Sequence, residues 1–237
     1  KAFKQKAMKI GMTQFVIQTH FETAMELTSE SKKAIERIQS AGWIITNQLV
    51  FTAGASKRGH TNKLRQALNT VGVLTYYTFT VKGFKENAAN FATNERAVQE
   101  QMEEKVIGMI PDKYQDTIRE FTEDAESLTD NIQALMLKTG LPFLGTDRNV
   151  LNLPGVGKSL TFRTIGITRY GRRILEFELD HTRTHTPAMK DMDKVIIIES
   201  KSISEYLQQL EEIGEDIAEY ESIWGYSIGE TEARSPL

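Results

Sequence analysis

Between residues 12 and 81 the chain alternates three short apolar runs of the β type with two helical patterns, and this order most constrains the fold. The runs are 12–20, 43–51 and 73–81. Segments 28–42 and 61–72 carry apolar residues at helical spacing, and each ends in a glycine. Because a crossover helix joins strands that run in the same direction, this alternation predicts a parallel sheet or a (β/α) barrel.

After residue 83 the pattern changes. Residues 84–140 are rich in Glu, Gln, Lys and Asn and are interrupted at Pro111, which favours a helical insert with a solvated acidic face. From residue 149 the β signal returns, with a hairpin that turns at Tyr170–Gly171, a strand over 194–200 and one closing amphipathic helix over 202–225. We therefore divide the chain into 1–83, 84–146 and 147–237.

Composition narrows the classes of partner. The net charge is −3, no cysteine is present, and no apolar run reaches the roughly 18 residues of a membrane span. We therefore expect no nucleic-acid partner, no membrane partner, no metal ligands within this chain and a cytoplasmic location. The chain also opens without methionine and enters a strand-like run almost at once. That opening predicts the C-terminal part of a longer protein.

Residues 152–160, NLPGVGKSL, contain a glycine pair followed by Lys158 and Ser159. A nucleotide-binding P-loop needs a glycine five positions before Gly157, where Asn152 stands, and a helix after the lysine, where SLTFRTIGIT alternates like a strand. Glycines also let a backbone approach a ligand closely, and a desolvated lysine amine can react with an aldehyde cofactor such as pyridoxal phosphate. A plain turn with a solvated lysine is the third alternative. The loop alone leaves all three open.

An ordered set of motifs extends beyond the loop. It comprises Thr19–His20–Phe21, Asn47–Gln48, Tyr76–Tyr77 and the PGVGK run that ends at Lys158. In this order and spacing the set resembles the lysine 2,3-aminomutase family of radical S-adenosylmethionine enzymes, over residues 12–83 and 149–159. The resemblance implies the C-terminal strands of a partial TIM-like (β/α) barrel, followed by a small β region and the closing helix.

The resemblance also implies site residues. Lys158 matches the lysine that binds pyridoxal phosphate, with Gly155 and Gly157 forming the cofactor loop. His20 and Gln48 match positions that contact S-adenosylmethionine. From the residues alone, each of the latter two could equally be a structural polar residue at a strand end or in a barrel interior.

Two further positions bear on the substrate. The lysine enzymes of the family hold the distal ammonium with two aspartates, and those positions are Lys82 and Asn152 here. A cation and a neutral amide suit a carboxylate instead. Both positions resemble the glutamate 2,3-aminomutase branch, so we expect an acidic amino acid, with glutamate favoured over lysine. The alternative is that Lys82 is a solvated lysine at a strand end.

The implied reaction is a radical 1,2 amino-group shift, an isomerisation that uses pyridoxal phosphate, S-adenosylmethionine and a [4Fe–4S] cluster. The family's cluster cysteines are absent here, so we expect this segment alone to be inactive and the longer protein to be the aminomutase. Two alternatives remain: a non-catalytic binding or assembly domain derived from the family, and a degenerate P-loop protein. The closing helix packs either on the rest of the chain or on a second subunit, so a homo-oligomer stays one of the alternatives.

Overall fold

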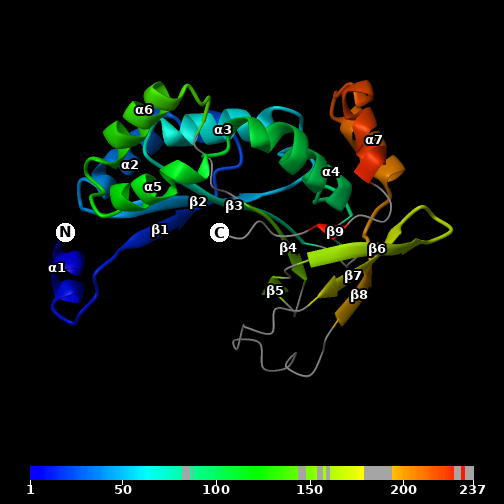
Figure 1. Cartoon of the computed structure of the whole chain (residues 1–237), viewed down its shortest axis with the longest axis horizontal. Helices are drawn as coiled ribbons and strands as arrows, with labels where there is room; N and C mark the ends of the chain where they lie inside the picture. Colours follow the sequence, from blue (N-terminus) through cyan, green and yellow to red (C-terminus); the bar gives the residue numbers. More distant parts are fainter. Residues whose placement is uncertain are drawn as a thin grey trace. The chain divides into compact units, whose positions relative to one another are not determined.

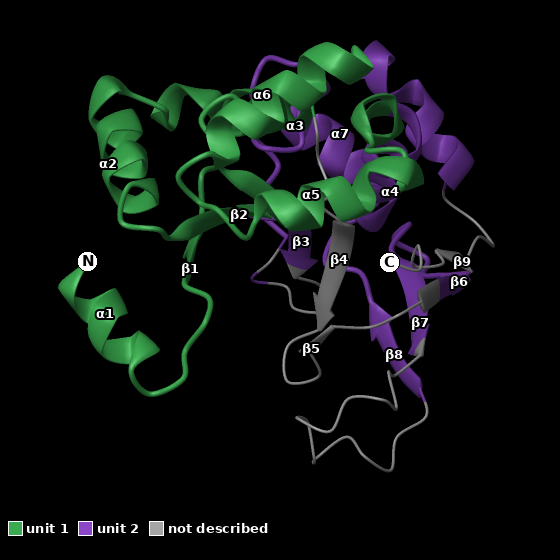
Figure 2. Cartoon of the chain, turned by 60° about the vertical axis from the view of Figure 1, so that its left-hand side comes forward, with its two compact units in different colours: residues 1–49, 59–77, 104–148 green, residues 50–58, 78–103, 149–237 purple. Residues whose placement is uncertain are grey.

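The computed structural model describes residues 1–81, 86, 88–143, 148–153, 157–158, 161–178, 194–226 and 231–232. The chain forms two compact units: residues 1–49, 59–77 and 104–148 in one, and residues 50–58, 78–103 and 149–237 in the other (Figure 2). Each unit draws residues from more than one of the three predicted segments, and the segment boundaries at 83 and 146 stay a prediction.

The strand–helix alternation that the sequence predicts is present, and its elements belong to the first unit except for residues 50 and 78–81. The elements are β1 (Val16–Thr19), α2 (Ser29–Gln39), β2 (Ile44–Val50), α3 (His60–Asn69) and β3 (Leu74–Val81). β1 pairs with β2 in parallel, with Gln18 opposite Thr46, and the strand order is β1-β2-β3. Figure 1 shows α2, α3, α5 and α6 on one side of β1 and β2.

These findings confirm an α/β fold with three parallel strands. A partial barrel stays a prediction.

The N-terminal residues, which precede the strand predicted over 12–20, form helix α1 (Ala2–Met8). Tertiary contacts hold this short helix: Lys4 Nζ donates to the Gly42 carbonyl at 2.8 Å, and the Phe3 ring lies 6.0 Å from that of Trp43. A seven-residue helix is not stable by itself in water, so these contacts decide its conformation.

The predicted helical insert contributes several short helices. They are α4 (Asn94–Gln99), a π-helical turn (Glu100–Glu104), 3-10 turns (Lys105–Gly108 and Asp112–Tyr114), α5 (Gln115–Phe121) and α6 (Leu128–Thr139). In the first unit, Leu128, Ile132 and Leu135 of α6 form a buried apolar cluster with Ile110. α6 ends at Gly140, whose φ of +69° favours glycine.

The second unit is built around a small antiparallel sheet of order β8-β7-β6-β9. The strands are β6 (Thr161–Ile167), β7 (Arg173–Glu178), β8 (Lys194–Ile198) and β9 (Thr231–Glu232). The turn at 170–171 and the strand at 194–198 were both predicted. One face of this sheet packs Leu175 and Phe177 against Val98 of α4.

The closing segment is two helices, so the prediction of one continuous helix is wrong. α7 (Ile203–Glu212) is followed by a 3-10 helix (Ile217–Tyr226). Gly214 lies between them with a φ of +85°, a left-handed conformation that stops an α-helix. Tyr206 of α7 and Tyr220 of the 3-10 helix are both fully buried in the same apolar cluster.

The prediction of a solvated acidic face is also wrong for α4. Glu95, Arg96 and Glu100 are fully buried. The Glu95 carboxylate contacts the guanidinium of Arg173 on β7 at 2.5 Å, and Arg96 donates to the Ser56 carbonyl at 2.8 Å. The charges along α4 therefore form the polar interior of the second unit and do not face solvent.

Candidate functional site

In the first unit, the chain that leaves β1 is held by Asn47 of β2. The Asn47 side chain is almost fully buried, at 3% exposure. Its Oδ1 accepts from the backbone N–H of Phe21 at 2.7 Å, and its Nδ2 donates to the Phe21 carbonyl at 3.0 Å. The Thr19 hydroxyl also donates to Oδ1 at 3.0 Å. Because Asn47 holds both neighbours of His20, the backbone position of this exposed histidine is fixed at the carboxyl end of β1.

Gln48, the next residue on β2, lies on the other face of the sheet. Its side chain is partly buried, and its Oε1 accepts a hydrogen bond of 2.7 Å from the hydroxyl of Tyr77 on β3. The side chain of Gln18 on β1 lies close enough to the Tyr77 phenol to lower its pKa. One side chain from each of three parallel strands therefore meets on this face. Polar groups near the carboxyl ends of parallel strands are where α/β proteins bind ligands.

Glu22 adds a carboxyl group beside the histidines. Its backbone carbonyl accepts a 2.6 Å hydrogen bond from Nε2 of His60, the first residue of α3. Burial raises the pKa of the Glu22 carboxyl, and the nearby Glu26 carboxylate raises it further, while the charges of His20 and His60 act in the opposite direction. The folded chain therefore disfavours the ionised form of Glu22.

This raised pKa predicts a pH-dependent effect of Glu22→Gln. Above the folded pKa wild type keeps an ionised Glu22 at a cost to stability, and below about pH 4 the group is protonated in both folded and unfolded chains. The variant should therefore be slightly more stable than wild type at pH 7, by less than about 1 kcal/mol because the group is partly exposed to solvent. Urea unfolding at pH 7 and at pH 4 measures the difference, which should shrink at pH 4. A variant less stable at pH 7 would contradict the raised pKa.

The described residues of the glycine loop lie on two strands, β4 (Arg148–Leu153) and β5 (Gly157–Lys158). The two strands are antiparallel, and the register places Asn152 directly opposite Lys158. Strand β6, and no helix, is the next described element after Lys158, which is the opposite of the P-loop requirement. Gly155 and Lys82 lie outside the described residues, as do the side chains of Asn152 and Lys158. The backbone thus brings two predicted site residues together in the second unit, whereas His20 and Gln48 belong to the first.

Among the described residues, no helix combines the length and the apolar composition that a membrane span requires. No group of three or more His, Asp or Glu side chains in this part of the chain is arranged to hold a metal ion.

Comparison with known proteins gives three relatives. The chain is 30% identical over 218 residues to an uncharacterized KamA family protein of Methanocaldococcus jannaschii. This match covers 89% of this chain and 29% of that protein. It is 35% identical over 74 residues to a putative L-lysine 2,3-aminomutase of Aquifex aeolicus, and 39% identical over 70 residues to the glutamate 2,3-aminomutase of Clostridioides difficile. The chain is similar to KamA-family proteins and 2,3-aminomutases.

The extent of these matches differs. The two aminomutase matches cover 31% and 29% of this chain, and 20% and 17% of the relatives. The chain thus matches less than a third of the length of each relative. No family model matches the chain, and no solved structure is significantly similar to it.

The structure adds residues that the motif set did not assign. Asn47 and Tyr77 were noted only as parts of motifs, yet Asn47 holds the chain around His20 and Tyr77 holds Gln48. Gln18 was not singled out at all. The available signal was the alternation along each strand, which puts Gln18 and Gln48 on one face once the register is known.

Proposed function

We propose that the chain forms part of a radical S-adenosylmethionine, pyridoxal phosphate-dependent amino acid 2,3-aminomutase that acts on an acidic amino acid, glutamate in particular. The observation that carries the proposal is the 30% identity to a KamA family protein over 89% of this chain, together with the shorter matches to two 2,3-aminomutases. The polar residues at the carboxyl ends of β1 and β2 support it.

The described residues are compatible with S-adenosylmethionine as a ligand. His20 is exposed, and the Nε2 of Gln48 has no hydrogen-bond partner within the described part of the chain. Both can donate to a carboxylate or a hydroxyl group. When bound, S-adenosylmethionine would supply the radical that starts the reaction. His20 and Gln48 would orient it, and Asn47 would keep the backbone around His20 in place.

Lys158 would hold pyridoxal phosphate, which supplies the electron-accepting ring for amino-group migration. Its place on a two-residue strand after a glycine loop is consistent with this, because glycine permits close approach of a ligand to the backbone. The chain has no cysteine, so it does not itself hold an iron–sulfur cluster. In the proposal those ligands come from elsewhere in the longer protein.

Lys82 and Asn152 would select the substrate. A lysine ammonium attracts the side-chain carboxylate of glutamate, and a neutral amide can donate to it, whereas the ammonium of a lysine substrate would be repelled. The match to glutamate 2,3-aminomutase is consistent with this preference.

Replacing Lys82 and Asn152 with aspartate tests the proposal. The longer protein, supplied with its cofactors, should convert glutamate to its 3-amino isomer and favour it over lysine. The Lys82→Asp, Asn152→Asp variant should lose that preference by at least about tenfold in kcat/KM, since two carboxylates would repel the substrate. Product formation from each amino acid measures it. An unchanged preference would contradict the charge argument, and no turnover of any amino acid by wild type would contradict the proposed activity.

A non-catalytic domain derived from the family is the second candidate. The absence of cysteine in this chain favours it only if the longer protein also lacks them. Three cysteines at C-x-x-x-C-x-x-C spacing upstream in the same reading frame would decide for the enzyme.

A further inference from the structure

We infer that Tyr77 is a positioning residue that fixes the orientation of the Gln48 amide, so that Gln48 presents its N–H donors to an oxygen or nitrogen acceptor on the ligand. This inference rests on the proposed function and assigns a role to a tyrosine outside the predicted site. All the residues involved belong to the first compact unit.

The strand register brings the three side chains together. Gln18 of β1 stands opposite Thr46 of β2, so Gln48, two residues further along β2, points to the same face as Gln18. Tyr77 of β3 reaches Gln48 with its hydroxyl, and its side chain is buried, at 9% exposure. Gln18 is exposed and Gln48 partly buried, so the polar cluster extends from a buried phenol to the open face of the sheet.

The chemistry of the cluster sets a direction. A glutamine amide has an acceptor end and a donor end, and these look alike in shape. The phenol proton of Tyr77 is donated to Oε1 of Gln48 at 2.7 Å. The acceptor Oε1 of Gln48 is thus engaged. The two N–H donors on its Nε2 have no hydrogen-bond partner among the described residues. A ligand group bound there must accept hydrogen bonds.

The phenol keeps its proton over the working pH range. Burial raises the pKa of Tyr77, with a further contribution from Tyr76, and the contact with Gln18 opposes it. Since the pKa of a phenol is ordinarily about 10, a raised pKa keeps Tyr77 a hydrogen-bond donor to the amide near neutral pH. Removing only the hydroxyl, by Tyr77→Phe, should therefore free the amide to rotate without changing the packing volume of the ring.

Four variants of the longer protein test the inference by titration calorimetry with S-adenosylmethionine. Tyr77→Phe should weaken binding about fivefold, the effect of one ordinary hydrogen bond. Gln48→Ala should weaken it by about tenfold or more. In the double variant, Tyr77→Phe should add nothing to Gln48→Ala, because the phenol acts through the amide. Gln48→Glu, which keeps an acceptor for Tyr77 but removes both donors, should bind at least as weakly as Gln48→Ala.

Tyr76→Phe is the matched control. It removes a hydroxyl from the neighbouring, 42% exposed tyrosine and should leave the affinity unchanged. Thermal unfolding of every variant reports whether a loss of affinity comes from a loss of folding.

The outcomes separate the inference from the proposed function. Full affinity in Gln48→Ala would remove Gln48 from the cofactor site and so overturn that part of the proposed function. A loss in Gln48→Ala with none in Tyr77→Phe would overturn the inference alone. A Tyr77→Phe effect that persists in the Gln48→Ala background would also overturn the inference. Full affinity in Gln48→Glu would overturn it too, because the ligand would then accept no hydrogen bond from this side chain.

Discussion

Replacing Lys158 with alanine is expected to reduce covalent capture of pyridoxal phosphate by the longer protein to background. The cofactor's aldehyde reacts with a lysine amine, and Lys158 is the lysine that follows the glycine loop, on β5 opposite Asn152. Incubation with pyridoxal phosphate, reduction with borohydride and peptide mass spectrometry should place the label on Lys158 in wild type. Catalytic turnover should be lost in the same variant.

Two controls separate the amine from its charge and from its neighbours. Lys158→Arg keeps the positive charge but is no longer a nucleophilic amine, and should also stay unlabelled. Lys194→Ala removes a half-exposed lysine of β8 that pairs with Glu176 at 3.1 Å, and should be labelled like wild type. Labelling of Lys158→Ala at another lysine with the wild-type yield would contradict the assignment.

Elements with strong local signals could be predicted from the sequence. β2 alternates buried and partly buried residues between two glycine-ended helical patterns, and the structure places it at Ile44–Val50. α2 begins after Thr28, whose hydroxyl accepts from the backbone N–H of Ser31 at 3.3 Å, the hydrogen bond for which threonine is favoured at this position. In both cases the information lies within about ten neighbouring residues, so no knowledge of the tertiary fold was needed.

Features that depend on distant residues could not be predicted. α4 reads as a surface helix because Glu95 and Arg96 are charged. Their burial depends on distant partners: Glu95 pairs with Arg173, and Arg96 donates to the Ser56 carbonyl. The orientation of Gln48 likewise depends on a tyrosine of the next strand. Gly214 is different, because a glycine that ends a helix is a local signal. The helical spacing of apolar residues on both sides of it nevertheless favoured one continuous helix.

In the second unit, replacing Arg173 with methionine is expected to destabilise the protein by about 3–5 kcal/mol, the cost of removing one partner from a buried ion pair. Arg173 Nε lies 2.5 Å from a Glu95 carboxylate oxygen and 3.2 Å from one of Glu199. All three side chains are at most 4% exposed. The same guanidinium also donates to the Thr164 hydroxyl and to the Tyr226 carbonyl, so it links β6, β7, α4 and the closing 3-10 helix.

The loss of stability should arise from the two carboxylates that Arg173 leaves behind. Glu199 would keep its contact with the backbone N–H of Asn94 at 3.0 Å, but the shared cation would be gone. Neutralising one acid, by Glu95→Gln in the Arg173→Met background, should therefore restore part of the stability, although Glu95→Gln alone should be destabilising. Urea unfolding of the two single variants and the double variant measures this coupling.

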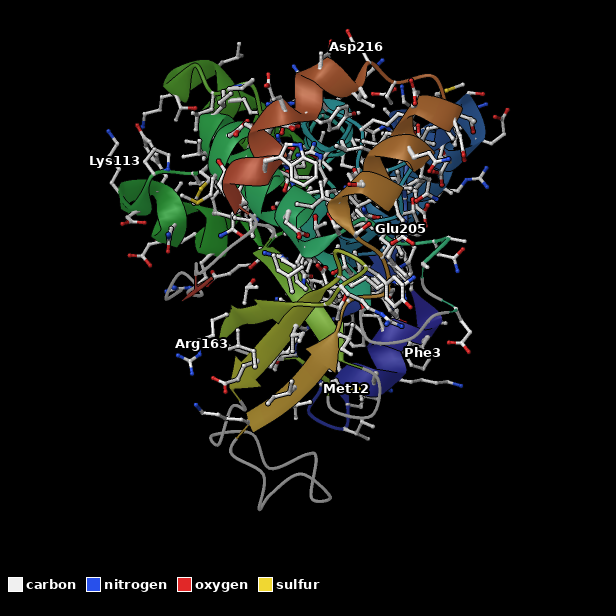
Figure 3. All side chains as sticks on the ribbon, turned by 90° about the vertical axis from the view of Figure 1, so that its right-hand side faces the viewer. Phe3, Met12, Lys113, Arg163, Glu205 and Asp216 are labelled. Atoms are coloured by element: carbon white, nitrogen blue, oxygen red, sulfur yellow. The ribbon has the colours of Figure 1, made fainter. Side chains whose placement is uncertain are left out.

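Arg163→Met is the matched control for Arg173→Met. Arg163 lies on the neighbouring strand β6 and also pairs with a carboxylate, Glu176, at 2.7 Å, but it is 54% exposed and its side chain extends away from the small sheet (Figure 3). Solvent screens that pair, and Glu176 keeps Lys194, so the change should cost less than about 1 kcal/mol. Equal losses for the two arginines would contradict the burial argument. Additive losses for Arg173→Met and Glu95→Gln would show that the carboxylates do not depend on a shared cation.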